Sequence, residues 1–104
     1  MASGILGQIV GTGSEADVYT CPASTLAVVN VSIINNDASN GESVVLRLVA
    51  SGDTSGAEHN LENFTLASNG VLERTNIVMG ASDKLTLNAS ADVSISVFGI
   101  EESV

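Results

Sequence analysis

The sequence has few aromatic residues, few basic residues and a single cysteine, and each scarcity limits what the chain can be. Aromatic residues make up 3% of the 104 residues, and tryptophan is absent. The core must therefore be built from Val, Ile, Leu and Ala, and the β-branched residues among these favour strands. Only 3 Lys and Arg stand against 12 Asp and Glu, a net charge of −9. Because this charge repels nucleic acid and anionic lipid, we expect no binding to nucleic acid or to a membrane.

The single cysteine, Cys21, cannot close a disulfide within the chain, whereas small secreted domains are usually held together by several. No apolar run approaches the roughly 20 residues that a membrane-spanning helix needs. The first residues also lack the positive charge that opens a signal peptide. These absences predict a single domain that is synthesised and folded in the cytoplasm.

What the sequence does contain is a series of short β-forming runs separated by turn residues. The strongest covers 26–35, where Val29, Val31 and Ile33 fall on one face of an extended strand and polar residues alternate with them. Eight such runs at intervals of about ten residues predict an all-β fold, an antiparallel β-sandwich of jelly-roll type. The other seven predicted strands cover 5–10, 16–21, 43–49, 59–66, 71–79, 84–89 and 93–100.

Three details of this pattern bear on pairing and assembly. The Asn69-Gly70 dipeptide suits a tight turn and predicts a hairpin between the runs 59–66 and 71–79. The run 43–49 is apolar on both faces except at Arg47, which predicts that a second sheet or another subunit covers it. The run 5–10 is either an arm or an ordinary first strand. We therefore divide the chain into 1–14, an N-terminal arm or first strand, and 15–104, a single β-sandwich domain.

Residues with chemical potential are sparse. His59 has the acidic neighbours Asp53, Glu58 and Glu62, but their spacing matches no metal motif and favours a solvated polar loop. Cys21 lacks a plausible histidine partner and no GxSxG elbow is present, so Cys21 is expected to be a small core residue. We predict no catalytic residue, cofactor or metal site and no enzymatic activity; a calcium ion between carboxylates of neighbouring subunits is the alternative.

The run ADVYTCPASTLAVVNVSIINND, at 16–37, resembles the opening of a family of small bacteriophage virion proteins. In that family a Tyr-Thr-x-Pro-Ala turn precedes a β-rich strand that ends in an Asn-rich loop. The runs NGVLER at 69–74 and SADVSISVFGIEE at 90–102 are similar to the family's later hairpin and terminal strand. The resemblance implies a virion structural protein, often homotrimeric, of the capsid or the tail. The absence of a long shaft or receptor domain favours the head.

From this resemblance we predict a capsid decoration, or cement, protein, made in the host cytoplasm and bound as an oligomer, a homotrimer by analogy, to the outer head surface. It would contact the major capsid protein and stabilise the shell. The alternatives are a tail, neck or fibre module that contacts a host receptor, and a cytoplasmic carbohydrate-binding or enzyme-accessory β domain. The predicted capsid contacts lie in a segment that would add a strand to a capsid sheet edge: Ile5, Leu6, Ile9 and Val10. The predicted subunit contacts are Val45 and Val49.

Overall fold

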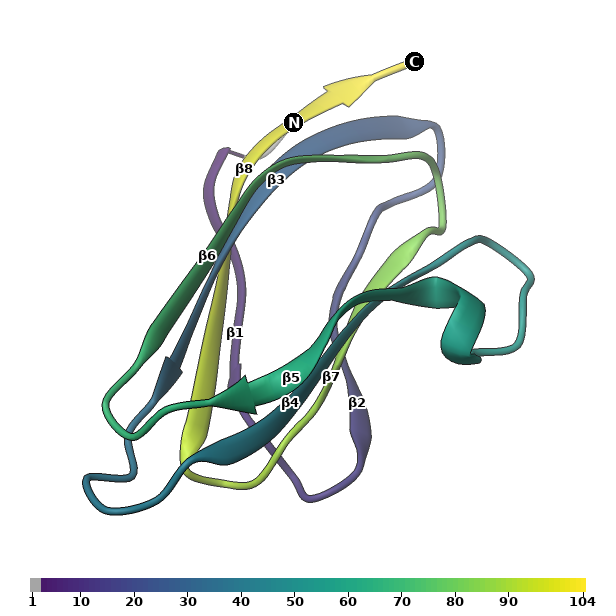
Figure 1. Cartoon of the computed structure of the whole chain (residues 1–104). Coiled ribbons are helices and arrows are strands. Elements are labelled where there is room, and N and C mark those ends of the chain that lie inside the picture. The colour runs from purple at the N-terminus through teal and green to yellow at the C-terminus, as the bar shows by residue number, and fades with distance from the viewer. Residues whose placement is uncertain (1–2) are drawn as a thin grey trace.

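The structure, a computed structural model, describes residues 3–104, which form eight β-strands and one short helical turn (Figure 1). The predicted all-β sandwich is confirmed. No helix in this part of the chain has the length and apolar character needed to cross a membrane. The strands are β1 (Ser3–Val10), β2 (Glu15–Thr20), β3 (Thr25–Asn35), β4 (Glu42–Val49), β5 (Asn60–Leu66), β6 (Val71–Met79), β7 (Lys84–Asn88) and β8 (Val93–Ser103), with the 3-10 turn η1 (Ala57–His59) before β5.

The strands form two four-stranded sheets in which every neighbouring pair is antiparallel. Sheet A has the order β1-β8-β3-β6, and sheet B has the order β2-β7-β4-β5. Consecutive strands alternate between the two sheets, except for β4 and β5, which are neighbours in sheet B. This winding of eight strands into two facing sheets is the jelly roll.

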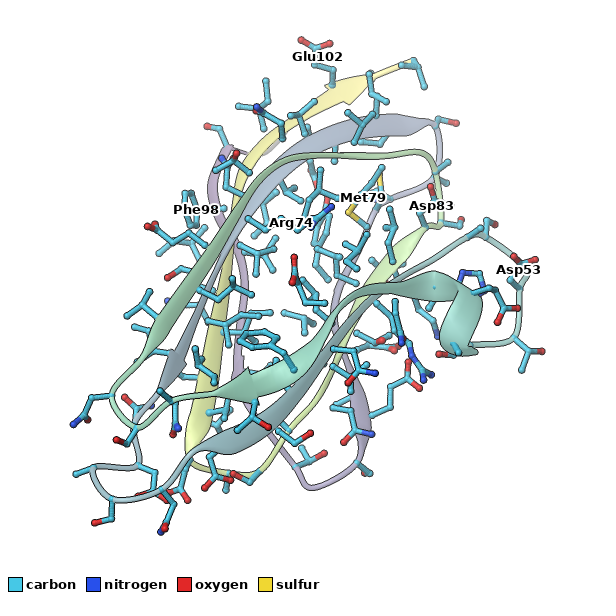
Figure 2. The ribbon with its side chains drawn as sticks, viewed as in Figure 1. Asp53, Arg74, Met79, Asp83, Phe98 and Glu102 are labelled. Carbon is cyan, nitrogen blue, oxygen red and sulfur yellow. The ribbon has the colours of Figure 1, made fainter. Side chains whose placement is uncertain are left out.

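The core lies between the two sheets, and β3 contributes the side chains that the sequence pattern assigned to it. Val29, Val31 and Ile33 are each at most 1% exposed. Leu46 and Leu87, which are neighbours across β4 and β7, face them from sheet B and are fully buried. Figure 2 shows the side chain of Met79 in this interior, between the sheets. The core therefore consists mainly of aliphatic side chains, as the scarcity of aromatic residues requires.

The predicted hairpin between 59–66 and 71–79 is wrong. β5 pairs with β4 in sheet B, whereas β6 pairs with β3 in sheet A. Asn69 does adopt the positive φ that suits a tight turn, 56°, but this turn carries the chain from one sheet to the other. A turn residue determines the local reversal of the backbone, while burial of the two apolar strand faces decides which sheet receives the next strand.

Each of the four edge strands is interrupted by a β-bulge or a similar register shift. The additional residues of three of these strands pack against the core and close the sides of the sandwich. A bulge disrupts the regular backbone ladder that an added strand would need, and so protects an edge from pairing with another chain. The additional residues are Leu6 in β1, Val18 in β2 and Leu61 in β5, and in β6 Thr75 and Asn76 lie opposite Asn30.

Candidate interaction surface

The outward side of sheet A gathers the exposed apolar side chains of the molecule. Among the residues described, eight large apolar side chains are exposed, and seven of them belong to strands of this sheet. We call this surface the neutral face. In Figure 2 the labelled side chain of Phe98 points away from the interior on this side. The seven residues are Ile5 and Val10 in β1, Ile34 in β3, Val71 and Val78 in β6, and Phe98 and Ile100 in β8.

Pairing between strands gathers most of these side chains into one patch at one end of the neutral face. Ile5 lies opposite Phe98, and Val28 lies opposite both Ile100 and Val78. Directly paired side chains on one side of a sheet contact each other. This patch therefore draws on all four strands of sheet A.

A second apolar patch lies at the other end of the neutral face, where Ile34 is opposite Val71 and Val10 lies in the same row. A polar row separates the two patches and is held together in part by a 3.0 Å hydrogen bond from Gln8 Nε2 to Ser96 Oγ. The neutral face is thus apolar at both ends and polar across its middle. The row consists of Gln8, Ser96, Ser32 and Glu73.

Charge is nearly absent from this face. β1 and β3 contain no charged residue, and nine of the twelve acidic residues lie outside sheet A. Of the three that remain, Glu101 accepts a hydrogen bond from Tyr19 of sheet B, and burial together with this neighbouring carboxylate raises the pKa of Tyr19. Arg74 reaches across the side of the sandwich to Glu62, at 2.7 Å. Glu73 and Glu102 are the charges left on the neutral face.

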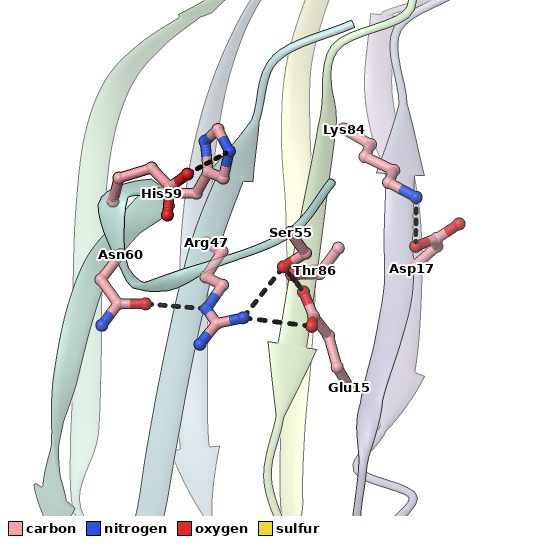
Figure 3. Close-up of polar contacts among 9 residues, drawn as sticks. Glu15, Asp17, Arg47, Ser55, His59, Asn60, Lys84 and Thr86 are labelled. Atoms are coloured by element: carbon pink, nitrogen blue, oxygen red, sulfur yellow. Dashed lines mark hydrogen bonds and ion pairs between the residues drawn. The ribbon is translucent and has the colours of Figure 1, made fainter. Parts of the chain in front are cut away.

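The outward side of sheet B is polar and is partly covered by the long connection between β4 and β5 (Figure 3). Ser55, in this connection, donates a 2.6 Å hydrogen bond to Glu15 and accepts one of 2.9 Å from Arg47 Nη1. Thr86 donates to the same oxygen of Glu15 at 2.6 Å, and Arg47 Nε donates to Asn60 at 2.8 Å. Ser55 thus ties the connection to β2 and β4, and Thr86 of β7 joins the same network through Glu15.

Glu15 lies at the centre of this network, and its charge should contribute to stability. Hydrogen bonds from Ser55 and Thr86, and then the nearby guanidinium of Arg47, lower the pKa of Glu15 below its ordinary value of 4.5. Because the folded-state pKa is lower than the unfolded one, this contribution is present above about pH 4.5 and is lost as the pH falls through the folded-state pKa. We expect Glu15→Gln to lower the free energy of unfolding by about 1–2 kcal/mol at pH 7.

Urea unfolding of both proteins at pH 7 and at pH 3 tests this expectation. The stability difference between wild type and Glu15→Gln should shrink at the lower pH, where the carboxylate of the wild type becomes protonated. A difference of the same size at both pH values would show that the charge of Glu15 does not contribute.

The structure places the residues predicted for subunit contact in unlike settings. Val49 is 1% exposed, so its side chain is not available to a second subunit in this fold. It shares the outward side of β4 with Arg47, where the β4–β5 connection passes over the sheet. The apolar run 43–49 is therefore covered at its Val49 end by a loop of the same chain. Val45 is half-buried and remains available at the surface.

The N-terminal residues predicted for capsid contact also divide into two pairs. Residues 3–10 form β1, an ordinary edge strand of sheet A, so the first-strand alternative describes them; residues 1 and 2 lie outside the described part. Leu6 and Ile9 pack against the core. Ile5 is 66% exposed and Val10 is 55% exposed, and both lie on the neutral face.

The structure brings together three carboxylates that sequence reasoning did not connect. Oxygens of Asp37, Glu42 and Asp92 lie within 4.8 Å of one another. Such oxygens suit a hard cation such as Ca²⁺. Backbone N–H groups already donate to Asp37 and lower its pKa, and Ser90 donates to Glu42 at 2.7 Å. No local pattern could have revealed this group, because Asp92 is far from the other two in the sequence.

Cys21 and His59 are both largely buried. Cys21 is 1% exposed, as expected of a small core residue, and burial raises the pKa of its thiol. His59 differs from the solvated residue that we expected, because its side chain is only 10% exposed. The sequence around His59 is polar, and nothing in it indicates that the connection folds back onto sheet B.

No protein-family model matches this sequence, and no curated protein matches it.

Proposed function

We propose that the chain is a bacteriophage virion structural protein, a capsid decoration protein that binds as an oligomer to the outer head surface and stabilises the shell. The observation that supports this proposal is the neutral face, which gathers seven exposed apolar side chains on a chain of net charge −9. A grouping of apolar side chains with so little charge is typical of an interaction surface. The jelly roll is compatible with this function but does not select it, because lectins and other proteins share the fold.

The contact with the major capsid protein uses the side chains of the sheet face rather than strand addition. β1 already pairs with β8 on one side, and its bulge at Leu6 interrupts the free edge. Near the middle of β1, Gly7 lies so close to β2 that a Cβ built on it would be 2.5 Å from the carbonyl oxygen of Val18. Ile5 and Val10 therefore provide exposed contact area, while Leu6 and Ile9 hold the strand in place.

The distribution of charge gives the proposed docking an orientation. With the neutral face against the shell, sheet B and the loops that carry nine of the acidic residues remain in water. Burial of the seven apolar side chains, which are already partly covered, would contribute on the order of 5–10 kcal/mol before the costs of association. The outward acidic residues would keep decorated particles apart by repulsion between like charges.

Immunogold electron microscopy of intact particles, with an antibody against this chain, tests the location. The proposal expects label spread evenly over the heads. Label confined to the tail or neck would replace it with the tail-module alternative, and unlabelled particles would contradict both.

A pair of arginine substitutions tests the docking face. We expect Ile5→Arg, on the neutral face, to weaken binding to heads that lack this chain by at least tenfold, because the contact would have to bury a charge without a partner. Asn63→Arg adds the same charge to an exposed position of β5 in sheet B and should change binding less than twofold. Cosedimentation of purified protein with such heads measures both. An equal loss for the two variants would argue against docking through the neutral face.

The tail-module alternative has one structural observation in its favour, a shallow cavity on the sheet B side. The cavity has polar and small side chains but no aromatic ring to stack on a sugar, which is why we place this alternative second. Its lining residues are Gly13, Glu42, Ser43, Val45, Asn88, Ala89 and Ser90.

A further inference from the structure

We propose that His59, Asp53 and Glu58 form a binding site for a divalent transition-metal ion, with Zn²⁺ the ion that their donor atoms fit best. The site lies on the connection between β4 and β5, away from the neutral face. It is independent of the proposed function, because a decoration protein does not require it.

The first observation is a buried nitrogen without a partner. Within residues 3–104, Nε2 of His59 is the one buried side-chain nitrogen or oxygen that makes no hydrogen bond. The side chain around it is 10% exposed. Buried polar atoms are almost always paired with a protein group, a water molecule or an ion, so a water molecule or an ion is expected beside this nitrogen.

The second observation is the position of two carboxylates beside that nitrogen. Asp53 Oδ2 lies 3.7 Å from Nε2, and Glu58 Oε2 lies 3.9 Å from it. Both distances are too long for hydrogen bonds. In a tetrahedral zinc site, bonds of about 2.0–2.2 Å place neighbouring ligand atoms roughly 3.3–3.6 Å apart, closer than in this structure, where the ligand atoms of these three residues do not all lie within 4.8 Å of one another. The two carboxylate side chains are 56% and 74% exposed, so they are free to rotate toward a shared ion.

The segment that carries these residues is anchored to the sheet. The backbone N–H of His59 donates to Gly56 at 3.0 Å, which forms η1. On either side of η1, Ser55 is bonded to Glu15 and Asn60 is bonded to Arg47 (Figure 3). The histidine is therefore held in one place, and only the two exposed carboxylates need to adjust.

The donor set selects the class of ion. A neutral imidazole with two carboxylates balances the charge of a divalent cation, and a water molecule would complete four-fold coordination. Imidazole nitrogen is a good ligand for zinc, whereas Ca²⁺ and Mg²⁺ prefer oxygen ligands alone. The net charge of −9 also raises the local concentration of cations.

The test is titration of the full-length, chelator-treated protein with Zn²⁺ and, separately, with Mg²⁺. Isothermal titration calorimetry should show one equivalent of Zn²⁺ bound, and the NMR signal of His59 Nε2 should move with Zn²⁺ but not with Mg²⁺. We expect His59→Gln to weaken Zn²⁺ binding by at least tenfold. Asp53→Asn, at an exposed position, should weaken binding without affecting folding.

A matched control separates this site from the oxygen-only group of Asp37, Glu42 and Asp92. Asp92→Asn removes a carboxylate of that group and should leave Zn²⁺ binding unchanged. The proposal is wrong if Zn²⁺ does not bind, if Asp92→Asn abolishes the binding, or if Zn²⁺ binds while the Nε2 signal stays in place. If His59→Gln does not fold, Asp53→Asn and the NMR signal still decide the matter.

Discussion

Replacing Asn35 by leucine should lower the free energy of unfolding by about 3–4 kcal/mol, because several buried backbone groups would lose their partner at once. Asn35 ends β3 and is fully buried. Its Nδ2 lies 3.0 Å from the carbonyl oxygens of Asn40 and Leu66 and 3.2 Å from that of Ala67. Its Oδ1 accepts the backbone N–H of Asp37 at 2.9 Å. One side chain thus joins the turn after β3 to the end of β5.

Urea unfolding at pH 7 measures this effect, and the neighbouring residue provides the control. Asn36 makes one side-chain hydrogen bond, to Ser94 Oγ at the surface, so Asn36→Leu should cost less than about 1 kcal/mol. Asn35→Asp should be nearly as damaging as Asn35→Leu, since a carboxylate has the same shape but cannot donate to carbonyl oxygens. Equal stability of Asn35→Asp and the wild type would show that the donated bonds do not matter.

Gly99→Ala should destabilise the protein by about 3 kcal/mol, for a steric reason. A Cβ at residue 99 would lie 2.1 Å from the carbonyl oxygen of Val28 and 2.8 Å from the Cα of Val29. Both atoms belong to the backbone of β3, which is paired on both sides within sheet A. β3 can therefore move away from the added Cβ only by disturbing its pairing with β6 and β8.

Thermal and urea unfolding of Gly99→Ala and Gly80→Ala test this expectation. At Gly80 the nearest atom to an added Cβ is Asp83 Oδ2, at an ordinary contact distance of 3.5 Å, so this variant should be close to wild type. A similar loss of stability in both variants would contradict this expectation. It would mean that replacing any glycine destabilises the protein, and that the close approach of β8 to β3 is not the cause.

The strands could be predicted from the sequence because their signals are local. Alternation of apolar and polar residues located β3 and identified its buried face at Val29, Val31 and Ile33. The pairing of β5 was predicted wrongly, because Asn69-Gly70 specifies a turn but not the sheet in which the next strand lies. In a jelly roll nearly every connection changes sheets, so neighbours in sequence are poor guides to neighbours in space.

The candidate surface was only partly accessible from the sequence. Ile5 and Val10 were identified as apolar residues of one segment, but Val78 and Phe98 join them only through the register of sheet A. Burial of Val49 and His59 depends on a loop that folds back onto sheet B through long-range hydrogen bonds. Such contacts between segments far apart in the chain leave no periodic trace in the sequence.

The pairing of β1 with β8 has a consequence for how the chain reaches this fold. The first and last strands are neighbours in sheet A, so that sheet cannot close until β8 has left the ribosome. Most contacts join residues far apart in the sequence, and proteins with such high contact order fold in milliseconds to seconds rather than microseconds. Before the sheet closes, the aliphatic strands of the chain are exposed to solvent and could aggregate. Each copy of the chain carries a net charge of −9, and the repulsion between these like charges opposes aggregation.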